Sequence, residues 1–429
     1  MNEVTNLEHE TINPVMHPAL SRRALVQSAF LIGAALAPAG NAIAAMVDTG
    51  GALTPFRIAV PQSELDDLKR RLDATRWPDK ETVADDSQGP QLERVRALVD
   101  YWRTRYDWRR LERRLNSYPQ YKTEIDGLGV HFLHIKSKHP KATPLIMTHG
   151  WPGSIVEFLE TIDPLVNPTA HGGKASDAFH VVLPSIPGHG FSDKPTTKGW
   201  GRTKIAYAWA ELMKRLGYSR YVAQGGDWGS VITTEMARLK VPGLAGVHVN
   251  LPFVGPNPLP SNPTPEEQAT IDQYNRFGTV GNAYFMVQAT RPETIGYALA
   301  DSPVGQAAWI YEKIAAWSQS DGVPENILSY DQILDDIMMY WVTDTGASAA
   351  RMYAENADLT FYSIPLDLPV AVSVFPGEIF TPPRSWAEKT YRNLVYWNRA
   401  AKGGHFAAFE QPAIFVNELR AGFGAMRLK

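Results

Sequence analysis

The sequence contains no cysteine, no long hydrophobic run and no block of like charges. The absence of cysteine excludes disulfide bonds and thiolate metal sites. The formal net charge is −3 over 429 residues without a basic stripe, so neither nucleic acid nor an acidic membrane surface is an expected partner. No segment is long and apolar enough for a comfortable membrane span. The chain is 44% hydrophobic, which suffices for one large core and additional modules.

The N-terminal segment has the pattern of an export signal. Ser21, Arg22 and Arg23 precede a short apolar stretch, residues 24–37, and small residues follow at 42–45. A twin arginine, a short apolar region and small residues in this order resemble a bacterial twin-arginine signal. We expect a signal peptide over residues 1–45 that is cleaved, a periplasmic or secreted mature protein, and no stable membrane anchor after cleavage. The alternatives are an amphipathic helix or an uncleaved anchor, and without export the protein would be cytoplasmic.

Short apolar runs alternate with helical patterns in two parts of the chain. In residues 141–250 the runs lie at 145–148, 180–183, 220–223 and 244–249, and in residues 366–429 they lie at 369–374 and 394–397. Each run ends in a loop that is followed by helical spacing. This alternation predicts an α/β fold with a mostly parallel, doubly wound sheet, whose ligands bind at the carboxyl ends of the strands.

Two further modules are predicted around this core. Residues 251–365 carry no strand signal, begin with a proline-rich linker and continue with helical patterns, which indicates a helical cap. Residues 46–140 show two amphipathic helical patterns followed by two strand-like runs, 122–125 and 130–135. Asp126 and Gly127 between these runs predict a hairpin.

One acidic residue stands at the centre of a glycine-rich turn. Residues 225–230 read GGDWGS, after an apolar run and before a helical pattern. This is the strand–turn–helix context of a nucleophile elbow, with Asp227 in place of the usual serine. A carboxylate is ionised at neutral pH and can attack a saturated carbon without a base. The pattern predicts Asp227 as a nucleophile that forms an alkyl ester, although an Asp in such a turn is about as often only a turn or N-cap residue.

An ester on Asp227 requires a base that activates water. His405 lies in a glycine-rich loop after the last strand, and Glu378 directly follows an earlier strand. Asn250 stands where the strand after the elbow helix ends, so Glu378 is the better candidate for orienting His405. Alone, either residue would more often be solvated than catalytic. The order nucleophile, acid, histidine along the chain is the order found in α/β-hydrolases.

Hydrolysis of the ester also requires backbone N–H groups that stabilise an oxyanion. Trp228 follows the nucleophile and supplies one N–H group. The loop after the strand at 145–148 reads HGWP, and Trp151 in this loop supplies the second. Pro152 has no N–H group and fixes the turn that directs its neighbour. The alternative for this loop is an ordinary strand-to-helix connection, but together with the elbow the motif favours the oxyanion role.

Several motifs together make the sequence resemble a known family. The motifs are HGWPGS at 149–154, PSIPGHGFSDKP at 184–195, GGDWGS at 225–230, DSPVG at 301–305, FPGE at 375–378 and GGHFAAFEQP at 403–412. From Pro55 to the C-terminus the chain resembles a microsomal-type epoxide hydrolase of the α/β-hydrolase superfamily. The resemblance implies the α/β-hydrolase fold and an N-terminal module, placed here at 46–140, that wraps the core and cap. It also implies addition of water to a small apolar epoxide to give a diol, with no cofactor and no metal.

The resemblance further implies two cap tyrosines that hydrogen-bond the epoxide oxygen. The matching positions are Tyr284, within NAYF, and Tyr353, within RMYAEN. A phenol with a pKa of about 10 can donate a hydrogen bond to a developing alkoxide while remaining protonated at rest. Composition alone would favour packing roles for any two of the 17 tyrosines.

Two other functions remain open at this point. A haloalkane or haloacid dehalogenase would use the same Asp nucleophile, with Trp228 as a halide donor. A non-catalytic binding member of the fold would be expected to have lost one of Asp227, Glu378 or His405, and all three are present. The sequence does not determine which epoxide is used, with which regio- and stereoselectivity, or whether the protein forms a homo-oligomer.

Overall fold

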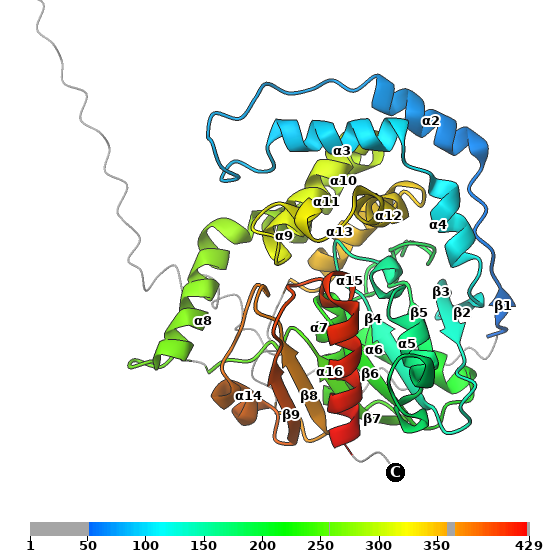
Figure 1. Ribbon diagram of the computed structural model, residues 1–429, viewed down its shortest axis with the longest axis vertical. Coiled ribbons are helices and arrows are strands. Elements are labelled where there is room, and N and C mark those ends of the chain that lie inside the picture. The colour runs from blue at the N-terminus through cyan, green and yellow to red at the C-terminus, as the bar shows by residue number, and fades with distance from the viewer. Residues whose placement is uncertain (1–50, 257, 358–364, 427–429) are drawn as a thin grey trace, which may run out of the picture. The chain divides into compact units, whose positions relative to one another are not determined.

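The computed structural model describes residues 51–256, 258–357 and 365–426 (Figure 1). The predicted signal peptide over residues 1–45 lies outside this range. The limits predicted for the modules stay a prediction, and the elements below are given with the bounds that the structure shows.

A nine-stranded sheet forms the centre of the described chain, in the order β1-β2-β3-β5-β4-β6-β7-β8-β9. Strands β4 to β9 pair in parallel, and β1, β2, β3 and β5 pair antiparallel along the other side. The mostly parallel sheet predicted from the apolar runs is therefore confirmed. The strands are β1 (Thr54–Pro55), β2 (Gln120–Ile125), β3 (Leu128–Ile135), β4 (Thr143–Thr148), β5 (Phe179–Pro184), β6 (Tyr221–Gly225), β7 (Leu244–Val249), β8 (Val370–Val374) and β9 (Leu394–Arg399).

The predicted hairpin is confirmed between β2 and β3. Its turn residues Asp126 and Gly127 both have positive φ, 50° and 75°. This is the backbone that an Asp-Gly two-residue turn adopts most readily, because glycine has no side chain to oppose it and Asp tolerates it.

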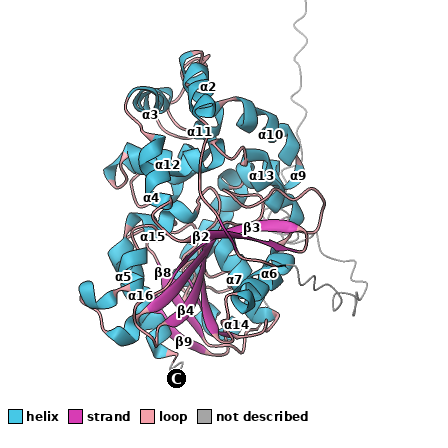
Figure 2. Ribbon diagram, turned by 90° about the vertical axis from the view of Figure 1, so that its right-hand side faces the viewer, coloured by secondary structure: helices cyan, strands magenta, loops and turns pink. Residues whose placement is uncertain are grey.

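Helices cover both faces of the sheet, which explains why its central strands are predominantly apolar. Every residue of β6 and β8 is buried. Figure 2 shows α5 and α16 on one side of the strands and α6, α7 and α14 on the other. These helices are α5 (Ile162–Val166), α6 (Arg202–Arg215), α7 (Trp228–Arg238), α14 (Arg384–Thr390), α15 (Ala407–Glu410) and α16 (Pro412–Ala425).

A cap of helices lies over the carboxyl ends of the parallel strands, and the N-terminal helices lie outside it (Figure 1). Helices α2 and α3 contact α11, and α3 and α4 contact α12. The cap helices are α8 (Pro265–Arg276), α9 (Ala283–Thr290), α10 (Pro292–Asp301), α11 (Pro303–Trp317), α12 (Tyr330–Trp341) and α13 (Gly346–Glu355). The N-terminal helices are α2 (Gln62–Asp73), α3 (Leu92–Thr104) and α4 (Trp108–Leu115).

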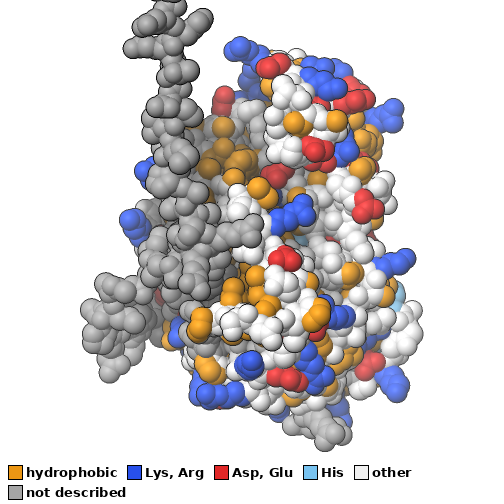
Figure 3. Space-filling view, turned by 90° about the vertical axis from the view of Figure 1, so that its left-hand side faces the viewer, with side chains coloured by type: hydrophobic (Ala, Val, Ile, Leu, Met, Phe, Trp, Pro, Cys, Tyr) orange, Lys and Arg blue, Asp and Glu red, His pale blue; other side chains and the backbone are white. Residues whose placement is uncertain are grey.

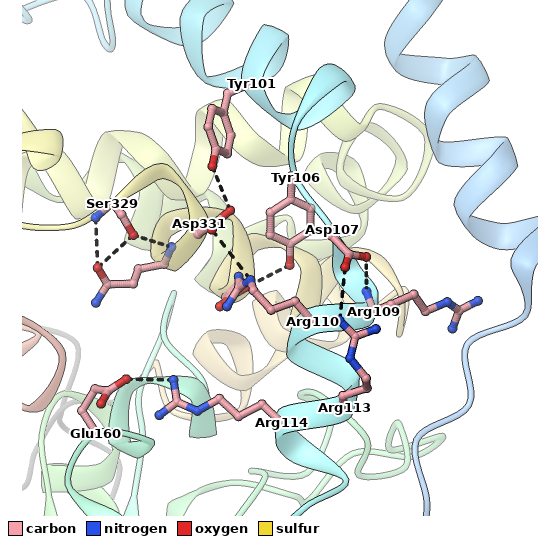
Figure 4. Close-up of polar contacts among 12 residues, drawn as sticks. Tyr101, Tyr106, Asp107, Arg109, Arg110, Arg113, Arg114, Glu160, Ser329 and Asp331 are labelled. Carbon is pink, nitrogen blue, oxygen red and sulfur yellow. Dashed lines mark hydrogen bonds and ion pairs between the residues drawn. The ribbon is translucent and has the colours of Figure 1, made fainter.

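A group of polar contacts joins the N-terminal helices to cap helix α12 (Figure 4). The Arg110 guanidinium lies 2.5 Å from Asp335, and the Tyr106 hydroxyl donates to the same carboxylate over 2.8 Å. Tyr101 donates to Asp331 one turn earlier, over 3.2 Å. Burial raises the pKa of Asp335 despite the opposing effect of Arg110. The paired cation therefore offsets part of the cost of burying a carboxylate that is only 4% exposed.

We expect Arg110→Met to lower the free energy of unfolding by about 2 kcal/mol, because it leaves the buried Asp335 without its cation. The value lies below that of a fully buried pair because the Arg110 side chain is 37% exposed. Urea denaturation would measure the change. Arg113→Met is the matched control on the same helix, since Arg113 is 71% exposed and pairs with Asp107 over 3.4 Å. Equal losses in the two variants would contradict a stabilising contact at Arg110.

The surface carries charges of both signs. On the face in Figure 3, basic and acidic side chains are scattered among one another wherever the described residues are visible. Among the described helices, none combines the length and the apolar character needed to cross a membrane.

Candidate active site

Asp227 occupies the turn between β6 and α7, as the elbow pattern predicts. Its backbone has φ 48° and ψ −127°, a conformation that is costly for a residue with a side chain. The turn is tight because α7 passes directly against β4: a Cβ atom at position 229 would lie 1.9 Å from the Thr148 carbonyl oxygen. Gly229 is therefore required for the turn, which holds the Asp227 side chain at the amino end of α7.

His405 connects the nucleophile position to Glu378. Its Nδ1 atom lies 2.6 Å from a carboxylate oxygen of Glu378, and its Nε2 atom lies 3.4 Å from an oxygen of Asp227. The side chains of His405 and Glu378 are 2% and 0% exposed. Ile379 N–H also donates to Glu378 over 2.8 Å, which fixes the carboxylate. The structure thus brings together three residues that the sequence separates by up to 178 positions, with the imidazole held between two carboxylates.

The charge state of His405 depends on both carboxylates. Burial lowers the pKa of His405, but the negative charges of Glu378 and Asp227 outweigh burial and hold that pKa well above its usual value. The imidazole is therefore protonated at neutral pH while both neighbours are ionised. Removing the charge of either carboxylate would lower the His405 pKa.

The loop after β4 directs a backbone N–H group at Asp227. Trp151 N–H donates to Asp227 Oδ1 over 2.8 Å. The approach requires glycine at the preceding position, since a Cβ atom at Gly150 would lie 2.3 Å from the same oxygen. Trp228 is the first residue of α7, so its N–H group lies at the helix end beside Asp227. Of the two predicted oxyanion donors, Trp151 N–H thus contacts the carboxylate directly, and Trp228 N–H belongs to the residue that follows Asp227 at the start of α7.

An aromatic cavity of about 480 Å³ opens between Asp227 and the cap. Eleven residues line it: Asp227, Trp228, Val231, Leu251, Phe253, Phe277, Tyr284, Phe285, Tyr353, Ile379 and Phe380. Asp227 is the only ionisable acid among them, and the phenols of two tyrosines are the other principal polar groups. A cavity with this mostly apolar lining and few polar groups suits an apolar ligand that presents one electronegative atom.

The two predicted cap tyrosines come from different helices and meet in this cavity. Tyr284 is in α9 and Tyr353 in α13, and their ring centres lie 5.8 Å apart. They are 5% and 1% exposed. Tyr284 stacks on Trp151 at 5.2 Å, and Tyr353 meets Trp228 edge-on at 4.9 Å. Burial, with the charge of Asp227 adding to it, raises the pKa of Tyr353 well above its usual value, so this phenol is protonated.

Asp227 also lines a second, more polar cavity of about 330 Å³. Asp227 and His405 line it together with Glu157, Gln224 and Asn250. Burial, together with the nearby negative charge of Asp336, raises the pKa of Glu157 well above its usual value. Glu157, three residues beyond the HGWPGS motif, is not among the residues predicted from the sequence. The available signal was an acidic residue inside the apolar run IVEFL.

Within the described residues, no group of three or more histidine, aspartate or glutamate side chains is arranged to hold a metal ion.

Two family models match the chain and together span most of it. The model described as the epoxide hydrolase N terminus matches residues 53–158, and that of the alpha/beta hydrolase fold matches residues 143–412. The second match alone spans more than half of the chain.

Named relatives are similar over nearly their whole length. A protein of Stigmatella aurantiaca that is provisionally named an epoxide hydrolase is 61% identical, covering 88% of this chain and 86% of its own. Epoxide hydrolase 1 of Sus scrofa is 34% identical, with 87% and 89% covered. The crystal structure of juvenile hormone epoxide hydrolase from Bombyx mori superposes with a TM-score of 0.81 at 31% identity, covering 88% of this chain and 95% of that one.

Proposed function

The chain belongs to the epoxide hydrolases of the α/β-hydrolase fold, and from this premise we propose that it adds water to an epoxide through an ester on Asp227. The product is a vicinal diol, and no cofactor takes part. One observation carries the proposal: Asp227 lies between an aromatic cavity with two phenols and a polar cavity with His405. Each cavity suits one half of a two-step reaction.

In the first step an Asp227 oxygen attacks the less hindered epoxide carbon. The carbon–oxygen bond of the epoxide breaks, its electron pair goes to the oxygen, and a phenol proton from Tyr284 or Tyr353 neutralises the alkoxide. Both tyrosines belong to cap helices and line the same cavity as Asp227, so a bound epoxide can contact the carboxylate and a phenol together. The aromatic lining supports an apolar epoxide as the substrate.

In the second step His405 activates water against the ester carbonyl. Esterification removes the charge of Asp227, which is one of the influences that hold the His405 pKa high. The imidazolium then releases its proton to the tyrosine phenolate, which restores the phenol, and the neutral imidazole accepts a proton from water. The N–H groups of Trp151 and Trp228 stabilise the oxyanion, and Glu378 keeps the imidazole oriented. Collapse of the tetrahedral intermediate releases the diol and regenerates the carboxylate.

The dehalogenase alternative has less support. Its leaving group is a halide, which is held by N–H donors and needs no proton. The phenols of Tyr284 and Tyr353 in the cavity suit an oxygen leaving group better, and the relatives above are named as epoxide hydrolases. The connected Asp227–His405–Glu378 set also argues against a binding protein without activity.

Isotopic labelling in a single turnover tests the ester route. With enzyme in excess over a styrene-type epoxide in ¹⁸O-water, we expect a diol without label, because its new oxygen comes from Asp227. The peptide that contains Asp227 should gain the label, which mass spectrometry would detect. Label in the diol with none in the peptide would show direct attack by water and would overturn the proposal.

We also propose that the protein is exported. The twin-arginine pattern at Arg22 and Arg23 supports a periplasmic or secreted enzyme from which residues 1–45 have been removed.

A further inference from the structure

A buried lysine lies against one of the two cap tyrosines. Lys313, in α11, is only 6% exposed. Its Nζ atom lies 4.5 Å from the centre of the Tyr284 ring and 5.5 Å from that of Trp317. Lysine is rarely buried, and its flexible stem normally carries the ammonium group out to water. Burying the ammonium group of Lys313 against two aromatic rings costs free energy, and a compensating interaction or a role is expected.

The ion pair of Lys313 does not explain why this lysine is buried. Its partner is the neighbouring Glu312, 2.7 Å away, whose side chain is 32% exposed. A pair between adjacent residues could form equally well at the surface, where both groups would remain hydrated. Water screens the charge of Glu312 more than that of the buried ammonium, so the ring of Tyr284 experiences a positive potential.

The second cap tyrosine has different surroundings. Tyr353 is enclosed by the rings of Trp228 and Phe285, at 4.9 and 5.2 Å. Burial and the negative charge of Asp227 raise its pKa, which makes loss of its proton harder. The two phenols of the cavity are therefore electrostatically unequal.

We propose that Lys313 is an electrostatic positioning residue that makes Tyr284 the proton donor in epoxide opening, while Tyr353 serves as a hydrogen-bond donor that keeps its proton. The inference rests on the proposed function. As Asp227 forms its bond to carbon and the epoxide carbon–oxygen bond breaks, the proton of Tyr284 moves to the epoxide oxygen. The negative charge then resides on the Tyr284 phenolate, next to the Lys313 ammonium, until the proton from His405 restores the phenol.

Two substitutions separate the charge of Lys313 from its bulk. Lys313→Met keeps the length of the stem without the charge, and Lys313→Arg keeps a cation that can lie over the ring. With a styrene-type epoxide in rapid-quench experiments, we expect Lys313→Met to slow formation of the Asp227 ester about tenfold, the scale of a desolvated cation–π contact. Hydrolysis of the ester should be unchanged, and Lys313→Arg should retain most of the alkylation rate. A general structural defect would slow both steps.

Tyrosine variants locate the effect. Lys313→Met should cause no further loss in a Tyr284→Phe background, because the group on which the cation acts is gone. In a Tyr353→Phe background the full loss of about tenfold should persist. Equal losses in both backgrounds, or alkylation at the wild-type rate in Lys313→Met, would overturn the inference.

Failure of this inference is distinguishable from failure of the proposed function. If wild-type enzyme forms the ester and Tyr284→Phe slows it, but Lys313→Met does not, the function stands and the role of Lys313 is wrong. If no ester forms on Asp227 in the wild-type enzyme, both are wrong. Lys313→Gln, which is smaller and polar, provides the same comparison if Lys313→Met does not fold.

Discussion

Replacing Asp227 with alanine is expected to reduce diol formation by roughly 10⁴-fold or more, the scale seen when an enzyme loses its nucleophile. The remaining phenols and imidazole can still polarise an epoxide, but no group is left to form the bond to carbon. The loss should appear in kcat, because the aromatic cavity that binds the substrate keeps its other ten lining residues. Steady-state assays of diol formation from a styrene-type epoxide would measure it.

Asp344→Ala is a suitable control for this variant. Asp344 also has positive φ, 49°, but its side chain is 66% exposed and pairs with Lys194 at the surface. Like Asp227→Ala, this control removes a carboxylate from a residue with positive φ. It leaves the cavity lining unchanged, so its kcat should match that of the parent. Thermal unfolding would establish that both variants are folded. Turnover by folded Asp227→Ala at the parental rate would refute the ester mechanism.

Replacing His405 with glutamine should separate the two steps of the reaction. Alkylation of Asp227 needs no base and should continue, whereas hydrolysis loses the group that accepts the proton of water. We expect the hydrolytic step to slow by roughly 10³-fold, so that the ester accumulates. Mass spectrometry after mixing with excess epoxide should then show the substrate mass added to the peptide that contains Asp227.

Glu378→Gln provides a graded comparison for His405→Gln. An amide can still accept from His405 Nδ1 across the 2.6 Å contact, but it removes one of the two charges that raise the His405 pKa. Hydrolysis should therefore slow less than in His405→Gln, and its dependence on pH should shift to lower pH. A His405→Gln variant that turns over normally, or one that is slow but accumulates no adduct, would contradict the assigned role of the imidazole.

Short sequence patterns were sufficient to predict much of the fold and the position of the nucleophile. Apolar runs that end in loops predicted the parallel strands, because strands covered on both faces are built mainly from apolar residues. Asp126 and Gly127 predicted their hairpin, because few residue pairs tolerate two positive φ values. Residues 225–229 identified the elbow, because a turn that brings α7 against β4 has no room for a side chain at Gly225 and Gly229. Each of these signals is contained within a few consecutive residues.

The roles of the two cap tyrosines could be predicted only from the resemblance to a family. Nothing in the spacing of Tyr284 and Tyr353 distinguishes them from the other tyrosines, because helical packing residues and cavity residues obey the same periodicity. Their convergence in the cavity depends on how α9 and α13 pack over the sheet. The N-terminal module posed a similar difficulty. Helices α2 and α3 were predicted, but α4 was not, and the contact of Arg110 in α4 with Asp335 joins residues 225 positions apart.

The sequence by itself determined where the chemistry is placed along the chain: a carboxylate in a strand–turn–helix, then an acid and a histidine after later strands. Only the tertiary structure decided the distances on which reactivity depends, from 2.6 Å at Glu378 to 3.4 Å at Asp227. It also decided that Glu157 faces the polar cavity and that Lys313 lies against Tyr284. The physical reason is that strand and turn preferences are local, whereas burial and electrostatic potential at a point sum over residues from every part of the chain.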